Sequence, residues 1–207
     1  MAPQTVLMHI TSENGLQTGQ TAKIEMIVPH LSAVLRILGV DLESEGLRET
    51  PRRVAKILVR ETFRGVDPAL KPQMTVFENT HGYKEMILEK YISFYSCCEH
   101  HLVPFFGHAH VAYVPKERLA GLSKLNRLVQ YLASKPQTQE GLTVEIGHAL
   151  QEALETPDVA VVLEATHLCI ASRGVKDTNS TTRTLFFHGA FEEHEKKNEF
   201  LRQIDAS

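Results

Sequence analysis

Three strand-like segments follow one another in this chain with no helical pattern between them, and this order constrains the fold more than any other feature. They cover residues 74–79, 84–96 and 105–117 and are rich in β-branched and aromatic residues. The other expected elements are helices over 22–40, 50–65, 123–134, 138–154 and 192–204, and strands over 158–172 and 181–191. Strands that are not separated by helices favour antiparallel pairing, so we expect an α+β fold.

The helical patterns near the N-terminus predict an arm distinct from the strand-rich part. Apolar residues in 22–40 recur at helical spacing. A second helix is expected to begin at Thr50 as N-cap, with Pro51 at its first position. We therefore expect a flexible leader over 1–21, a helical arm over 22–65 and one larger domain over 66–207.

Charge and composition exclude several classes of protein. The 207 residues include 22 Lys and Arg against 25 Asp and Glu, a net charge of −3, whereas general nucleic-acid binders are usually basic. No apolar run reaches the roughly 18 residues that a membrane span needs. Three cysteines without a signal peptide cannot form a disulfide framework and indicate a reducing, cytoplasmic setting. We expect neither a nucleic acid nor a membrane among the partners.

Histidine is clustered beside cysteine, which points to a metal site. In the run CEHH that begins at Cys98, a thiolate and the imidazole of His101 lie three residues apart and can converge on one ion. Cys169, on the expected strand 158–172, would complete a Cys₂His set with one open position, as in catalytic zinc sites. Cys97 competes with Cys98 for the ligand role, and spacing does not decide between them. Buried cysteines can also act as small hydrophobic residues.

Two further histidines are candidates for proton transfer. His100 adjoins the candidate ligands, and strand alternation would place His167, Cys169 and Arg173 on one face. Imidazole titrates near neutrality, which suits general acid–base catalysis. Without a metal nearby, the same residues would be a turn histidine and a sheet histidine with structural roles only.

Basic residues at two expected helix starts could form an anion site. Ser123 can cap a helix whose first turn carries Lys124 and Arg127 on one face, although basic residues there oppose the helix dipole. Arg53 and Lys56 repeat this spacing in the second helix. A bound polyanion would explain the placement, and so would an ordinary solvated helix face. The loop of P-loop NTPases is missing from the sequence.

Five segments of the chain form a specific set: ETPRRVAK, CEHHLVPFFGHAHVAYVP, GLSKLNRLVQ, QTQEGLT and EATHLCIASRGV. On these segments the chain resembles GTP cyclohydrolase I from about Gly46 onward. The resemblance implies the tunnelling fold, an antiparallel sheet with helices packed on one face. It also implies a decamer of two pentamers, Zn²⁺ as cofactor and GTP as substrate.

The resemblance also implies roles for individual residues. Cys98, His101 and Cys169 correspond to the zinc ligands, and His100 and His167 to the acid–base pair. Glu140 would bind the guanine edge, because a carboxylate can accept two N–H bonds from it. The residues that correspond to triphosphate contacts are Ser123, Lys124, Arg127 and Arg173, joined by Arg53 and Lys56 of a neighbouring subunit.

The implied reaction is hydrolytic opening of the imidazole ring of GTP, in which His100 protonates N7, formate leaves and 7,8-dihydroneopterin triphosphate forms. The chain departs from the family pattern at Gly141 in place of arginine, at His108 in place of lysine and in the segment 179–191. None of these positions is a ligand or a proposed catalytic group. The alternatives are a diverged paralogue that acts on another purine or stops at the formamide, and a non-catalytic zinc-stabilised nucleotide-binding protein.

Overall fold

The computed structural model describes residues 13–206, and the chain divides after Arg64 into two compact units. The first contains α1, Glu13–Ile37, and α2, Thr50–Ile57, which a π-helical turn extends over Leu58–Thr62. Arg52 donates to the Glu25 carboxylate through Nη1 and Nη2 and so ties α2 to α1. No helix of the described residues is long and apolar enough to cross a membrane.

Two helix starts differ from the expectation. α1 begins at Glu13 rather than at residue 22, and it continues through Pro29 to Ile37. Residues 1–12 of the predicted leader lie outside the described residues. Glu49 rather than Thr50 occupies the cap position of α2, and no side chain caps it. Pro51 lies in the first turn as expected, where its missing N–H leaves no bond unmade.

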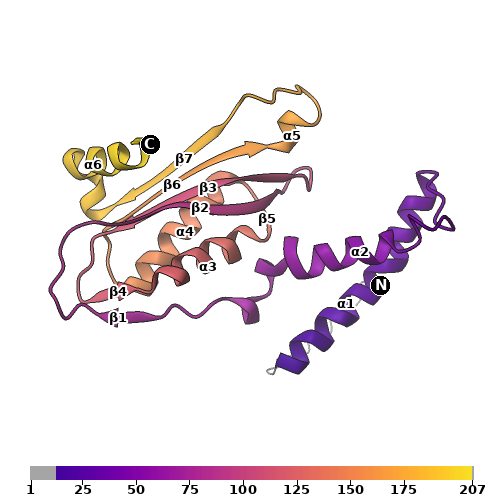
Figure 1. Ribbon diagram of the computed structural model, residues 1–207, viewed down its shortest axis with the longest axis horizontal. Coiled ribbons are helices and arrows are strands. Elements are labelled where there is room, and N and C mark those ends of the chain that lie inside the picture. Colours follow the sequence, from indigo (N-terminus) through magenta and orange to yellow (C-terminus); the bar gives the residue numbers. More distant parts are fainter. Residues whose placement is uncertain (1–12, 207) are drawn as a thin grey trace, which may run out of the picture. The chain divides into compact units, whose positions relative to one another are not determined.

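The second unit is built on a five-stranded sheet (Figure 1). Its strand order is β5 (Pro136–Gln137), β2 (Ile87–Cys98), β3 (Pro104–Tyr113), β6 (Val159–His167) and β7 (Thr182–His188). All neighbours are antiparallel except β5, which runs parallel to β2. Two short strands, β1 (Val76–Glu78) and β4 (Arg118–Ala120), form a separate ribbon. The antiparallel α+β prediction is therefore confirmed.

Helices cover both faces of this sheet. One face packs on α3 (Leu122–Ala133) and α4 (Gln139–Leu154), with apolar side chains such as Leu128, Ile146 and Val161 in one core cluster. The helix α6 (His194–Asp205) lies on the opposite face (Figure 1). Its Phe200 packs with Ala160 and Val162. The expectation of helices on one face only is wrong for α6. The buried residues of β6 that point to one face of the sheet are apolar, and so are those that point to the other face. Both faces of that strand must therefore be covered.

The expected strand 158–172 is also wrong beyond His167. β6 ends at His167, and a helical turn, α5, runs over Leu168–Ala171. His167 pairs with Phe105, next to Pro104 at the start of β3, and β7 begins only opposite Ala165. The backbone past His167 therefore has no strand to pair with, and it forms helical bonds instead: the Ser172 amide donates to the carbonyl of Leu168 at 2.9 Å.

Candidate active site

The turn after β2 brings two of the candidate ligands together. The carbonyl of Cys98 accepts from the amides of Leu102 at 2.8 Å and His101 at 3.4 Å, and the amide of Cys98 donates to Val103 at 2.9 Å. Leu102 adopts a left-handed conformation with φ of 52°, which closes the turn. The chain therefore folds back at the end of β2, and the His101 ring lies 3.8 Å from Sγ of Cys98, measured to Nδ1.

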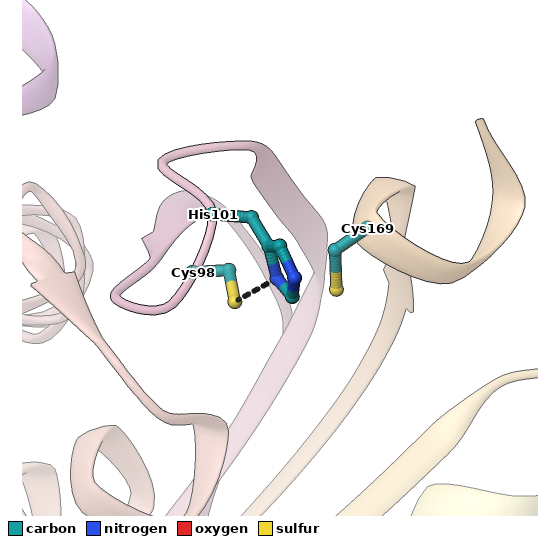
Figure 2. A group of neighbouring side chains, drawn as sticks. All are labelled: Cys98, His101 and Cys169. Carbon is teal, nitrogen blue, oxygen red and sulfur yellow. Dashed lines mark hydrogen bonds between the residues drawn. The ribbon is translucent and has the colours of Figure 1, made fainter. Parts of the chain in front are cut away.

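The third candidate ligand comes from α5, beyond the end of β6. The ligand atoms of Cys98, His101 and Cys169 all lie within 4.8 Å of one another (Figure 2). Among the described residues this is the only group of three or more side chains of the ligating types that is placed in this way. Cys98 is buried, Cys169 is half-buried and His101 is exposed, so the group is reachable from the His101 side. Cys169 reaches it from a helical turn and not, as expected, from a strand face.

Cys97 lies outside this group. Neighbouring residues of a strand point to opposite faces, and the Cys97 side chain is buried, with Sγ 3.9 Å from the carbonyl oxygen of Cys98. Burial raises the pKa of the Cys97 thiol. Burial also raises the pKa of the Cys169 thiol, and the neighbouring Cys98 adds to that shift through a hydrogen bond and its charge. Two adjoining sulfurs and an imidazole form a soft donor set, which suits Zn²⁺.

His167 is the last residue of β6, two residues before Cys169, and its ring is held by two contacts. Its ring stacks on Phe105 with 4.7 Å between the ring centres and 5° between the planes. Its Nε2 lies 2.7 Å from Oε1 of Gln139, at the start of α4. Burial lowers the pKa of His167, and the negative charge of Glu140 acts in the opposite direction. Desolvation therefore favours the neutral imidazole, which can accept a proton.

His100 and Glu99 occupy the exposed side of the same turn. Nδ1 of His100 lies 3.8 Å from Sγ of Cys98, and its Nε2 lies 3.8 Å from Oε1 of Glu99. The backbone amide of Glu99 donates to the carbonyl of Gln137 on β5. The Glu99 carboxylate thus faces His100 and does not join the group of ligand atoms.

Glu140 lies at the same end of the sheet, in the first turn of α4. The hydroxyl of Thr138 caps this helix by accepting from the amide of Gly141 at 3.1 Å. The Glu140 side chain is exposed, and it directly follows Gln139, whose side chain binds His167. The guanine-edge candidate is therefore held next to one of the histidine candidates.

Arg173 also reaches this end of the sheet, since its Nη1 lies 2.9 Å from Nε2 of His101. A guanidinium group only donates, so this contact uses the lone pair of Nε2. The structure thus places Arg173 against a candidate metal ligand. Its position was expected from the alternation of side chains along a strand, but the chain is no longer a strand beyond His167.

The remaining basic candidates lie elsewhere. Asn126, between Lys124 and Arg127 on α3, donates to the Glu89 carboxylate at 3.1 Å, at the opposite end of β2 from Cys98. Nine residue-to-residue steps along the strand separate Glu89 from Cys98, roughly 25–30 Å. Gly121, not Ser123, occupies the cap position of α3, so the predicted cap is wrong. The structure therefore does not bring these basic side chains to the candidate ligands within one chain.

Arg53 and Lys56 belong to the first unit and lie three residues apart on α2, both exposed. The shared spacing predicted from the sequence is thus present on one helix.

Gln139 is the residue that sequence reasoning missed. The segment QTQEGLT draws attention to the carboxylate of Glu140, whereas an uncharged amide gives no comparable signal until its hydrogen-bond partners are known.

Comparison with known proteins places these residues in one family. The family model for GTP cyclohydrolase I matches residues 27–205. A "GTP cyclohydrolase 1" of Flavobacterium johnsoniae is 47% identical over 192 residues, 93% of this chain and 86% of that protein. Proteins of the same name from Actinobacillus pleuropneumoniae and Aeromonas hydrophila are 49% and 47% identical over 180 residues, 86% of this chain and 83% of each relative.

Proposed function

Because the chain belongs to the GTP cyclohydrolase I family, a family of enzymes, we propose that it hydrolytically opens the imidazole ring of GTP, releases formate and forms 7,8-dihydroneopterin triphosphate. The observation that carries this proposal is the convergence of Cys98, His101 and Cys169 within 4.8 Å. His167 and Glu140 adjoin the same end of the sheet, where a proton acceptor and a guanine-binding carboxylate are needed.

We propose Zn²⁺ as the metal of this site. Two thiol sulfurs and one imidazole fit it as ligands, because zinc accepts Cys and His at a tetrahedral centre and a catalytic site keeps its fourth position open. When bound there, the metal would supply a Lewis acid that makes water nucleophilic at neutral pH. Coordination by His101 needs a ring lone pair, so it would end the contact with Arg173 and free that cation for a phosphate.

The chain's own groups would bind the base and move protons. Glu140, exposed at the start of α4, would accept N–H bonds from the guanine edge and so orient the purine. His100, exposed beside Cys98, would donate a proton to N7 as the ring opens. His167, which desolvation favours in its neutral form, would accept a proton at the same end of the sheet.

We propose that the triphosphate binds at a junction between copies of the chain. Ser123, Lys124 and Arg127 begin a helix far along the sheet from Cys98, so a second copy would have to present them. Arg173 would join them from the metal end, and Arg53 and Lys56 would come from a neighbouring α2. Cationic side chains around free helix N–H groups suit a polyanion.

Open sheet edges support an oligomer. In the described part of the chain, β7 pairs only with β6, and the outer side of β2 pairs only at Cys97 and Cys98. Unpaired edges of this length invite pairing with another chain, and closing a ring of sheets removes them. We propose that copies close the sheet into the barrel of the tunnelling fold, and that two pentameric rings form a decamer.

One incubation with GTP tests the proposed function. Quantifying formate together with the pterin fluorophore should give equal amounts of both from the zinc-loaded protein. Formate without the pterin would indicate an enzyme that stops after deformylation. GTP binding with neither product would indicate a non-catalytic nucleotide-binding protein, and either result would overturn the proposal.

A further inference from the structure

We propose that Gln139 is a positioning residue that holds His167 in a single orientation and tautomer, with the proton on Nε2 and the lone pair on Nδ1. This inference rests on the proposed role of His167 in proton transfer. It concerns a residue pair joined by a 2.7 Å hydrogen bond between α4 and the end of β6.

The amide of Gln139 can adopt only one orientation. Its side chain is 2% exposed, and Nε2 donates to the carbonyl of Leu163 at 3.2 Å, to the carbonyl of Thr182 at 3.0 Å and to the hydroxyl of Thr184 at 3.0 Å. Turning the amide over would place Oε1 against two carbonyl oxygens that cannot donate. The strands β6 and β7 therefore fix which end of the amide faces His167.

Two threonines behind the amide complete this network. The Thr143 hydroxyl donates to the backbone carbonyl of Gln139 at 2.8 Å, and it lies 2.6 Å from the Thr184 hydroxyl. Since the single proton of Thr143 is used, Thr184 must donate to Thr143, which leaves a lone pair of Thr184 to accept from Gln139. Each polar atom of the Gln139 side chain therefore has a partner of the right kind, and the network is rigid.

The fixed amide determines the tautomer of His167. Because Oε1 of Gln139 can only accept, Nε2 of His167 must carry the proton, and a neutral ring then has its lone pair on Nδ1. Stacking on Phe105 fixes the plane of the ring. A histidine that is free to rotate would offer the wrong nitrogen part of the time, so Gln139 maintains the basic atom in one place.

A double-mutant cycle in kcat tests this inference on the zinc-loaded enzyme. Hydrogen-bond partners that orient metal-ligating histidines are typically worth about 10–100-fold, and we expect Gln139→Leu to lower kcat by a similar factor, with KM for GTP changed by less than about twofold. In a His167→Ala background, Gln139→Leu should cost less than about twofold, because the group that it positions is gone.

Gln137 provides a matched control. It is also a buried glutamine, whose Nε2 donates to the Leu132 carbonyl at 2.7 Å and to the Ser96 hydroxyl at 3.1 Å, but no hydrogen bond joins it to His167. The factors by which Gln137→Leu and His167→Ala each lower kcat should multiply in the double variant. Multiplicative effects for Gln139→Leu as well would show a merely structural role and overturn the inference.

The tautomer can be read directly, even if the leucine variant fails to fold. Nitrogen NMR of histidine-labelled wild-type protein should show His167 protonated at Nε2, and protonation at Nδ1 would overturn the inference. Loss of activity in His167→Ala with full kcat in Gln139→Leu would overturn it while leaving the proposed function intact. Full formate release by His167→Ala would instead overturn the role of His167 in the proposed function, and this inference with it.

Discussion

The two ends of the five-stranded sheet differ in how much of a site one chain can assemble. At the end where β2 and β6 terminate, Cys98, His101 and Cys169 converge within 4.8 Å, and His167 and Gln139 are hydrogen-bonded beside them. At the other end, α3 carries Lys124 and Arg127 near its start, and Asn126 ties this helix to Glu89 near the start of β2. One end is rich in candidate ligands and hydrogen-bond partners, and the other carries basic side chains.

The difference follows from how far apart the candidate residues lie along the sheet of one chain. Candidate ligands at the first end come from the turn between β2 and β3 and from α5, which follows the strand β6 that pairs with β3, so folding of one chain brings them together. Lys124 and Arg127 are separated from them by the length of β2, and no folding of the same sheet can close that distance. Symmetric association can do so, because it places the first end of one copy near the second end of another.

The largest effect is expected from removing a candidate ligand. Cys169→Ser should lower bound zinc from about one to less than about 0.1 per chain and reduce formate release to background, because two remaining ligands hold zinc weakly. Metal content by elemental analysis and formate release should fall together. His101→Ala and Cys98→Ser should behave in the same way.

Cys97→Ser is the control for that experiment. It alters a neighbouring cysteine whose buried side chain lies outside the group of ligand atoms, so metal and activity should both be retained. A metal-free Cys97 variant beside a metal-loaded Cys98 variant would reverse the ligand assignment.

The next largest effect concerns the histidines that flank the candidate ligands. His100→Ala and His167→Ala should each lower kcat by about 10²–10⁴-fold, the usual contribution of a general acid or base, while zinc content stays unchanged. Elemental analysis on the same samples distinguishes the roles. A His100 variant without zinc would mean that a ligand has been mistaken for an acid.

Complementation between variants tests whether the two ends act together across chains. Lys124→Ala disables the basic end and His167→Ala disables the metal end, and each variant alone should be nearly inactive. When both are co-expressed, random mixing should give about one quarter of the sites two intact ends, and kcat per chain should recover to that extent. No recovery in mixed oligomers shown to contain both chains would mean that each site is built within one chain.

The sequence predicts the elements that have their own periodicity, and it fails where partners decide. Apolar spacing predicts the long strands and α3 and α4, but β4 and β5, with three and two residues, are too short to show a pattern. The end of β6 at His167 depends on Pro104 and on the late start of β7, which only the assembled sheet reveals. Strand length is thus a tertiary property here.

The candidate site shows the same limit. Cys98 and His101 are close in sequence, and their spacing already predicts a shared ion. Choosing Cys98 over Cys97 requires the resemblance or the strand alternation seen in the structure. Gln139 gives no sequence signal because its role depends on acceptors from Leu163, Thr182 and Thr184, which are distant in sequence and meet only in the fold.

A buried histidine between the two ends shows what the same residue type does away from a site. His110, on β3, is 1% exposed, and its Nδ1 has no hydrogen-bond partner. Burial lowers the pKa of His110, and the charges of His108, Arg183 and Lys90 lower it further. The Glu164 carboxylate, 3.9 Å from Nε2, acts in the opposite direction. Tyr91 packs edge-on against the ring. His167 shares the direction and main cause of this shift but has a hydrogen-bond acceptor.

The smallest effect is therefore expected in stability and not in catalysis. A histidine whose pKa is lowered by folding binds fewer protons in the folded state, so its contribution is fully present above the unfolded pKa near 6.5 and is lost as the pH falls towards the lower, folded value. One such proton gives the free energy of unfolding a slope of at most about 1.4 kcal/mol per pH unit. His110→Gln should flatten this slope below pH 6.5, measured by urea unfolding at several pH values. His81→Gln, at an exposed turn, is the control and should leave the slope unchanged. Equal slopes in the wild type and in His110→Gln would show that His110 does not contribute.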